Sequence, residues 1–415
     1  IQFCVRPQIY LVFFETQTIS IKNYVFFSFY ILLLPYIGYL CNIKKVLKKR
    51  FIHMAKKIRI KDIADLAGVS AGTVDRVLHN RGNVTEDKRI RIEEALQKMN
   101  YTPNIHVSAI SLRKSYKFVI AIPKSSAGEY WSFAEKGINA ALETYSAIDI
   151  QCEFCYYNHF DLFSCRTSFE QVIQHEPDAV IIGPTFRDET IYLANQLSDM
   201  NIPYIFVDST VEGASPLAFY TANPYTCGYL IAKLITQITP KDADIALFQA
   251  IRVGDESANT TILRKAGFMA YYAEHKLQNK LCRVNYSAQD NEKNEDLLKD
   301  YFITNHNIKG AVIFNSRAHV ITNYFKRHKI RDVKFVGIDL TEKNAKALDE
   351  GYLDFLVEQR AGQQAYMAVE TLIQYLVFGK SVQNNNYMPM DIIVKENADL
   401  YKESSAATLF FNTQR

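Results

Sequence analysis

Apolar residues recur at helical spacing in a short segment that begins near residue 60. Four of them fall at i, i+3, i+4 and i+7, which places them on one face of a helix. They are Ile60, Ile63, Ala64 and Ala67. Gly68 then provides a turn, and Ser70 is a suitable N-cap for a second helix. That helix repeats the spacing with Val74, Val77 and Leu78, so the pattern predicts two helices that share a small core across a tight turn.

The apolar stripe of the second helix leaves its opposite face to solvent. The outward residues are Gly72, Arg76 and His79, with Thr73 and Asp75 at the flanks. A planar guanidinium is suited to guanine O6 and N7, and small residues allow a close approach to bases. A third helix is predicted from Thr85, and its inner face comprises Ile92, Ala95, Leu96 and Met99. The segment has the pattern of a helix-turn-helix DNA-binding head.

After residue 116 the pattern changes to apolar runs that alternate with amphipathic stretches. The runs predict strands at Phe118–Pro123, Ile150–Tyr157, Ala179–Pro184, Tyr204–Asp208, Ile245–Ala250, Ala311–Asn315 and Phe335–Asp339. The clearest helices are Phe133–Tyr145, Tyr225–Thr239 and Ile262–His275. This alternation predicts an α/β fold in which helices flank parallel sheets, and the length of this part predicts two lobes.

Polar and aromatic side chains follow the predicted strands. Ligands of parallel sheets bind beyond the carboxyl ends of the strands, here in a cleft between the lobes. The residues at these ends are Glu129, Tyr130, Trp131, Asp208, Asn315, Ser316, Asp339, Glu358 and Gln359, and Arg264 is expected at the start of a helix. Aromatic faces stack on sugar rings, and carboxylates accept hydrogen bonds from paired hydroxyls. The set favours a neutral polyol over a phosphate.

The head resembles that of the lactose-repressor/galactose-repressor (LacI/GalR) family. The matching runs are Asp62-Ile63-Ala64, Ala67-Gly68-Val69-Ser70, Thr73-Val74, Arg76-Val77-Leu78, Asn100-Tyr101 and Pro103-Asn104. The resemblance implies that the second helix and its flanks contact double-stranded operator DNA. The implied DNA-binding residues are Ser70, Ala71, Gly72, Thr73, Asp75, Arg76, His79, Asn104 and Ile110. Asp75 departs from the serine usual in the family, which puts the contact at this position in doubt.

The segment after Asn104 matches the hinge of the same family. There the resemblance implies a helix that forms on operator DNA, and Ile110 stands at the position of the minor-groove wedge. Val107 replaces the usual alanine and is a poorer helix former. A plain linker is the alternative.

The body resembles the periplasmic-binding-protein-type sensor domain of the family. The matching runs are Arg264-Lys265-Ala266-Gly267-Phe268, Val336-Gly337-Ile338-Asp339 and the segment from Glu358-Gln359 to Gly379. The resemblance implies that Arg264, Asn315 and Asp339 contact the effector, and Asp208 and Gln359 are added as candidates. Tyr130 and Trp131 either stack on the ligand or close the first helix. The alternative for the Asp and Asn residues is helix capping.

Charge separates the head from the body. The formal charge is +6 over residues 1–53, +5 over 54–115 and −7 over the remainder. A basic head on an acidic body indicates that only the small segment meets a polyanion. The seven cysteines are odd in number and scattered, which favours a reducing compartment over a disulfide framework. Cys152 and Cys155 form a CxxC inside a predicted strand and are interpreted as ordinary thiols, not a metal or redox site.

Two interpretations of the first residues stay open. Asn23–Ile43 has no charged residue and is long enough to cross a bilayer, with a lysine cluster after it. The favoured alternative is that Met54 is the true initiator and that residues 1–53 have no function. Membrane association is therefore not expected.

These observations predict a regulator in five parts: an extension at 1–53, a helix-turn-helix domain at 54–104, a hinge helix at 105–115, a two-lobed ligand-sensing domain at 116–403 and a tail at 404–415. By the resemblance, a cytoplasmic homodimer binds a pseudo-palindromic operator and responds to a small carbohydrate. No catalytic motif, metal site or cofactor is expected, since phosphate-loop, HExxH and GxSxG patterns are missing. A membrane-tethered regulator and an exported solute-binding protein are the alternatives.

Overall fold

The computed structural model describes residues 59–78, 82, 84–99, 114–253, 259–302 and 307–403. The chain divides into two units, residues 1–104 and 105–415, each described by itself below. The described part of the first is called the head, and that of the second the sensor. His79, Asn104, Ile110, the extension at 1–53 and the tail at 404–415 lie outside the described residues.

The head is a three-helix unit built from α2 (Ile60–Ala67), α3 (Ala71–Leu78) and α4 (Glu86–Lys98). Its core consists of Ile63, Ala64, Ala67, Val74, Ile92 and Ala95. Gly68 ends α2 with φ +65°, a left-handed conformation that glycine adopts without strain. The predicted helix pair across a tight turn is confirmed. The third helix begins at Glu86, one residue after the predicted start at Thr85.

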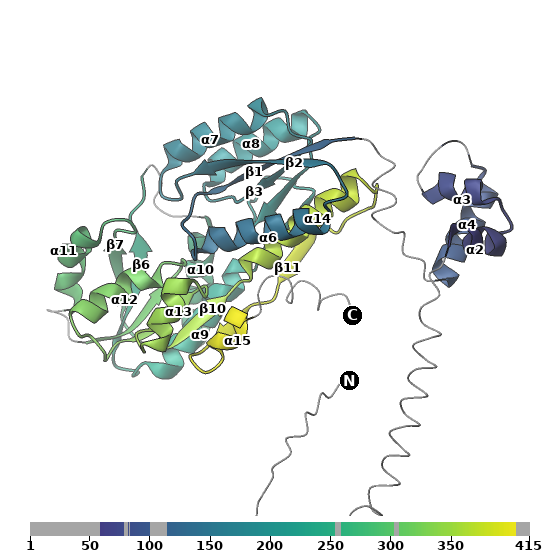
Figure 1. Cartoon of the computed structure of the whole chain (residues 1–415). Helices are drawn as coiled ribbons and strands as arrows, with labels where there is room; N and C mark the ends of the chain where they lie inside the picture. The colour runs from purple at the N-terminus through teal and green to yellow at the C-terminus, as the bar shows by residue number, and fades with distance from the viewer. Residues whose placement is uncertain are drawn as a thin grey trace, which may run out of the picture. The chain divides into compact units, whose positions relative to one another are not determined.

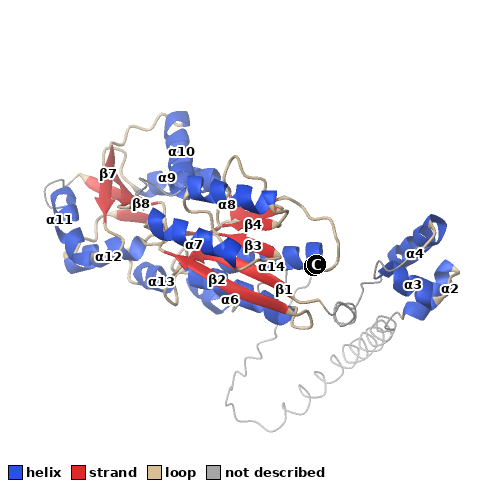
Figure 2. Ribbon diagram, turned by 90° about the horizontal axis from the view of Figure 1, so that it is seen from above, coloured by secondary structure: helices blue, strands red, loops and turns tan. Residues whose placement is uncertain are grey.

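The sensor contains two six-stranded sheets (Figures 1 and 2). Lobe 1 has the strand order β11-β5-β4-β3-β1-β2 and lobe 2 the order β12-β10-β9-β8-β6-β7. The pairs are parallel except for β10 with β12. The predicted α/β class with two parallel-sheet lobes is therefore confirmed.

The strands of lobe 1 are β1 (Tyr116–Pro123), β2 (Ile150–Tyr157), β3 (Ala179–Ile182), β4 (Tyr204–Val207), β5 (Ala218–Ala222) and β11 (Asn385–Met388). Those of lobe 2 are β6 (Asp244–Ala250), β7 (Leu281–Tyr286), β8 (Ile308–Ile313), β9 (Lys334–Ile338), β10 (Phe355–Glu358) and β12 (Asp391–Ile393). The helices are α6 (Tyr130–Thr144), α7 (Leu162–Gln174), α8 (Arg187–Asp199), α9 (Pro224–Ile238), α10 (Asn259–Glu274), α11 (Asn291–Phe302), α12 (Ala318–Arg327), α13 (Glu342–Asp349), α14 (Ala361–Leu376) and α15 (Ala398–Glu403).

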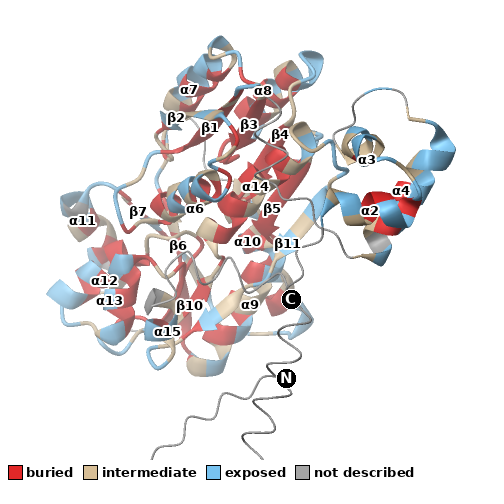
Figure 3. Ribbon diagram, turned by 45° about the vertical axis from the view of Figure 1, so that its right-hand side comes forward, coloured by how far each residue is buried: buried red, intermediate tan, exposed pale blue. Residues whose placement is uncertain are grey.

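Alternate residues of each central strand enter different cores. In β1, Phe118 and Ile120 pack with residues of α6 and α14, whereas Val119 and Ala121 pack with residues of α7 and α8. Helices therefore cover both faces of the sheet, and the buried strands lie between them (Figure 3). In lobe 2, α9 and α10 cover one face, and α12 and α13 contribute to the core on the other.

Several boundaries and elements differ from the predictions. α6 begins at Tyr130, not Phe133, and α10 begins at Asn259, not Ile262. Four strands were not predicted, namely β5, β7, β11 and β12, and of β10 only the end at Glu358 was predicted. These strands are short, or expose alternate residues as β7 does, so their apolar signal is weak. The thiols of Cys152 and Cys155 are free.

The lobes are joined where the chain passes between them, after β5, after β10 and after β11. Arg360 stands at the second passage with φ +62°, and Asp391 lies just beyond the third. The guanidinium donates two hydrogen bonds to the Asp391 carboxylate, at 2.6 and 3.0 Å. This bidentate pair ties two of the connections together.

No helix in the described part of the chain combines the length and the apolar character needed to cross a membrane. The segment Asn23–Ile43, on which the membrane-tether hypothesis rests, is outside that part.

Candidate functional site

The exposed face of α3 is the first candidate surface. Its core contact is Val74, which is fully buried, while Ala71, Gly72 and Arg76 are exposed. Thr73 and Asp75, the predicted flanking residues, are half-buried. The small residues and the arginine therefore share the solvent side of one helix, as the spacing predicts.

Ser70 fixes the start of this helix. Its hydroxyl oxygen accepts a hydrogen bond from the Thr73 backbone N–H at 3.2 Å and lies 2.9 Å from the Thr73 hydroxyl. This is an N-cap, which satisfies one of the donors that a helix start leaves without a partner. The cap thus supports a helix of which only Val74 is fully buried.

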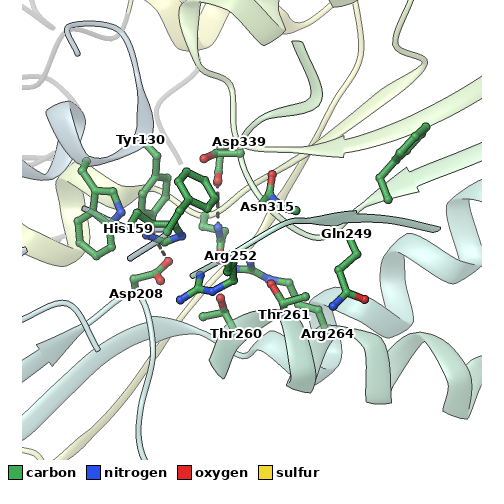
Figure 4. Close-up of a pocket in the computed structure, with 16 residues that line it drawn as sticks. Tyr130, His159, Asp208, Gln249, Arg252, Thr260, Thr261, Arg264, Asn315 and Asp339 are labelled. Carbon is green, nitrogen blue, oxygen red and sulfur yellow. Dashed lines mark hydrogen bonds between the residues drawn. The ribbon is translucent and has the colours of Figure 1, made fainter. Parts of the chain in front are cut away.

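The second candidate site is a cleft in the sensor, between the carboxyl ends of the strands of the two lobes. All the predicted ligand-binding residues line it: Tyr130, Trp131, Asp208, Arg264, Asn315, Asp339 and Gln359. Figure 4 shows the labelled members of this set around a common space. Their role as ligand contacts stays a prediction.

The lobe 1 wall is built around Asp208. This residue follows β4 with φ +71°, and its backbone N–H donates to the Gln364 side-chain oxygen at 2.9 Å. The Tyr130 hydroxyl donates to the Asp208 carboxylate at 2.7 Å. Burial raises the pKa of Asp208 above its ordinary value, and Arg264 opposes that shift. Trp131 packs edge-on against Tyr130, so both aromatic residues belong to the first turn of α6 and also face the cleft.

The lobe 2 wall is a buried hydrogen-bonded chain. The Arg264 guanidinium donates to the Phe314 carbonyl at 2.8 Å and to the Gln359 side-chain oxygen at 2.6 Å. The Gln359 amide then donates to the Asp339 carboxylate at 2.9 Å. Burial, followed by the nearby Glu358 carboxylate, raises the pKa of Asp339 well above its usual range. Arg264 lies in the second turn of α10, not at the helix start as predicted, because α10 begins earlier.

The cleft also contains residues that the sequence pattern did not predict. They are His159, Phe160, Phe248, Gln249, Ala250, Arg252, Thr260 and Thr261. His159 and Arg252 stand two residues after the ends of β2 and β6, so the position of ligand sites beyond strand ends also points to them. Burial, and then the charges of Arg252, Arg317 and Arg264, hold the pKa of His159 well below its usual value. Its imidazole is therefore neutral, with one donor and one acceptor nitrogen.

Backbone contacts hold the lobes together around the cleft. The Glu342 N–H of lobe 2 donates to the Gly128 carbonyl of lobe 1 at 3.0 Å. The Val253 N–H of lobe 2 donates to the Phe160 carbonyl of lobe 1 at 2.8 Å, and the Leu162 N–H donates to the Val253 carbonyl at 3.2 Å. The lobes are thus in contact at the edges of the space that the polar residues line.

Two family descriptions match the chain. "Periplasmic binding protein domain" matches residues 118–381, and "Bacterial regulatory proteins, lacI family" matches residues 59–104. The sensor is similar to the crystal structure of a putative LacI transcriptional regulator from Bacteroides fragilis. The two are 33% identical with a TM-score of 0.66, and the match covers 69% of this chain and 100% of that one.

Among curated proteins, the chain is similar to the uncharacterized HTH-type transcriptional regulator YkvZ of Bacillus subtilis. They are 49% identical over 63 residues, which are 15% of this chain and 19% of YkvZ. It is also similar to the ribose operon repressor of Bacillus subtilis, with 29% identity over 178 residues, 42% of this chain and 50% of the repressor. The chain thus spans half or less of the length of the first curated relatives it matches.

Proposed function

The chain belongs to the LacI family of bacterial regulatory proteins, and from that premise we propose that it is a transcriptional regulator that binds operator DNA through α3 and senses a small carbohydrate in the sensor cleft. It acts in the cytoplasm, where its DNA target lies. The observation that carries the DNA-binding part is the exposed face of α3, where Arg76 lies one turn from Gly72 while Val74 anchors the opposite face. Such a helix fits the major groove, where an arginine fork reads guanine.

The carbohydrate part rests on the chemistry of the cleft. Its walls combine aromatic faces, such as those of Tyr130 and Trp131, with carboxylates and amides that already hold fixed hydrogen bonds. Sugars present both apolar ring faces and paired hydroxyls, which match such walls. The names of relatives, the ribose operon repressor among them, agree with a sugar effector.

The regulator is proposed to act as a homodimer on a pseudo-palindromic operator, because a two-fold protein presents two copies of α3 to two half-sites. Ligand binding between the lobes changes their spacing and so the affinity for DNA. Sedimentation of the full chain with and without the selected duplex measures this stoichiometry. One protein per duplex would contradict the dimer.

The function is tested by binding the full chain to duplexes selected from a random-sequence pool. Affinity should fall steeply with added salt, as phosphate contacts release counterions. Arg76→Ala should weaken binding to the selected duplex by about 1 to 3 kcal/mol and change binding to random DNA little, because a base contact is lost.

Arg91→Ala is the matched control, since Arg91 is an exposed arginine on α4 whose partner is Asp87 of the same helix. It should leave the preference for the selected duplex unchanged. An equal loss on selected and random DNA for Arg76→Ala would refute its role in base recognition, and salt-independent or absent duplex binding would refute the regulator.

A further inference from the structure

A second compartment adjoins the cleft of the sensor. The space described above is called the inner compartment, and its neighbour the outer compartment. The two share a wall that includes Tyr130, Trp131, His159 and Asn315. The two spaces are therefore adjacent, and a ligand that fills the inner compartment lies next to the outer one. The outer compartment alone is lined by Lys124, Ser125, Glu129, Arg317 and His319.

The two compartments differ in charge. In the inner one, the two arginines Arg252 and Arg264 are matched by two carboxylates, those of Asp208 and Asp339. Formal charge there is balanced, which suits a neutral sugar ring. Figure 4 shows these four side chains around the same space.

The outer compartment carries an excess of positive charge. Its lining includes two cationic side chains, Lys124 and Arg317, and one carboxylate, that of Glu129. Glu129 is already paired with two cations, because its oxygens lie 3.4 Å from the Arg317 guanidinium and 3.5 Å from the Lys343 ammonium. His319 adds no charge to this lining, since burial lowers its pKa to about 4 and leaves the imidazole neutral. An anion is the group that this lining lacks.

The donors of the outer compartment have unused capacity. Arg317 makes two long contacts, at 3.4 Å each, to Glu129 and to the Ala288 carbonyl, although a guanidinium has five N–H donors. The Lys124 ammonium has no hydrogen bond or ion pair with any described residue. The Ser125 hydroxyl oxygen is buried and has no hydrogen-bond partner in the described part of the chain. Three residues with unused donors thus line one compartment.

We propose that the outer compartment binds the acidic group of an anionic carbohydrate, a carboxylate, sulfate or phosphate carried by a sugar whose ring lies in the inner compartment. The proposal rests on the proposed sensing of a carbohydrate and narrows it to an acidic one. Lys124, Arg317 and Ser125 supply the charge-assisted and neutral hydrogen bonds to the acidic oxygens. The aromatic and polar residues of the inner compartment hold the ring.

The test is calorimetric titration of the full chain with matched pairs of sugars. The probes are D-galacturonate and galactose, D-glucuronate and glucose, galactose 6-sulfate, and glucose 6-phosphate. At least one acidic sugar should bind tenfold or more tightly than its neutral parent, and this preference should shrink as sodium chloride is added. The acidic sugar that binds most tightly shows whether the acidic group is a carboxylate, a sulfate or a phosphate.

Lys124→Gln should reduce the acid preference roughly threefold to tenfold without changing binding of the neutral parent. Lys233→Gln is the control, because Lys233 is an exposed lysine of α9 that lines neither compartment. Equal affinity for acid and parent, an unchanged preference in Lys124→Gln, or no binding of any probe would each overturn the proposal. Binding of the selected duplex is measured on the same protein. If the protein prefers acidic sugars but does not bind the duplex, only the DNA-binding function is refuted. If it binds the duplex but does not prefer acidic sugars, only the proposal of an acidic ligand is refuted.

Discussion

The head and the sensor use the same side chain in opposite surroundings. Arg76 of the head is exposed on α3, whereas Arg264 of the sensor is only 3% exposed and donates to the Phe314 carbonyl and Gln359. A duplex is large and brings its own surface to desolvate an exposed arginine when it binds. A small ligand is enclosed by the protein, so its contacts have to be positioned before it arrives. Surface recognition thus tolerates exposed side chains, and cleft recognition depends on packing.

The packing around Arg264 gives the sharpest way to test this difference. Gly228 of α9 lies against the backbone of α10, and a Cβ at this position would meet the Arg264 carbonyl oxygen at 1.7 Å. Gly228→Ala should therefore force α9 and α10 apart, lower the free energy of unfolding by about 3 kcal/mol, and displace Arg264 from the cleft. Urea unfolding of the full chain and ligand titration measure the two effects.

The same substitution in the head serves as control. Gly72 is exposed in α3, and a Cβ there would have no neighbour nearer than the Ser70 hydroxyl oxygen at 3.9 Å. Gly72→Ala should leave the head as stable or stabilise it by up to about 1 kcal/mol, because alanine is the better helix former. A sensor that accepts Gly228→Ala without loss would contradict the tight helix contact.

Removal of the buried guanidinium should have the next largest effect. Arg264→Ala leaves the Phe314 carbonyl and the Gln359 amide oxygen without a buried donor. The sensor should lose about 3 kcal/mol of stability and its response to ligand, whereas Arg76→Ala should leave thermal stability unchanged. Arg264→Lys keeps the charge but not the planar fork, so it should recover more stability than ligand affinity. Full ligand binding by Arg264→Ala would remove this residue from the site.

The sequence predicts the head better than the sensor for a physical reason. The head is specified by contacts between near neighbours, so the spacing of Ile63, Ala64 and Ala67 with the Ser70 cap suffices to predict its helices. In the sensor, the strand-end rule correctly brings Asp208 and Asp339 to one cleft. Both have a positive φ, which the sequence pattern did not reveal.

Other parts of the sensor depend on contacts between distant segments. The hydrogen bond from Arg264 to Gln359 joins residues 95 positions apart, and no local pattern contains it. The outer compartment likewise combines Lys124 of lobe 1 with Arg317 of lobe 2, and only the packing of the two lobes reveals its charge. The edge strands β11 and β12 were missed because their pairing with β5 and β10 comes from the returning C-terminal segment.

Acid should destabilise the sensor through His319. Burial, and then Lys343 and Arg317, lower the pKa of this histidine to about 4, and its hydrogen bond with Asn344 opposes that shift. Below about pH 6.5 the unfolded chain protonates this imidazole while the folded sensor keeps it neutral, so stability falls as the pH decreases towards 4. Between pH 7.5 and pH 5, this difference in protonation lowers the free energy of unfolding by about 2 kcal/mol.

The comparison of wild type with His319→Gln isolates this contribution. The pKa values of Asp208 and Asp339 are raised in the folded state, so protonation of these two carboxyls stabilises the fold as the pH falls. In the wild type this effect partly cancels the destabilisation caused by His319. From pH 7.5 to pH 5, the free energy of unfolding of His319→Gln should fall by about 2 kcal/mol less than that of the wild type. Urea unfolding at the two pH values measures the difference. Identical pH dependence of the two proteins would show that His319 is not held neutral.

The smallest effect is expected at the start of α3. Ser70→Ala removes the hydroxyl that accepts from the Thr73 N–H, and the loss of an N-cap should destabilise the head by about 1 kcal/mol. Hydrogen exchange of the α3 amides in the full chain measures this, since it reports the head separately from the sensor. The matched change in the sensor is Ser198→Ala, because the Ser198 hydroxyl donates to the Ala194 carbonyl inside α8 and caps nothing. That variant should change α8 exchange by less than about 0.5 kcal/mol. Equal effects of the two serine substitutions would mean that α3 is ordered by its core contact at Val74 and not by its cap.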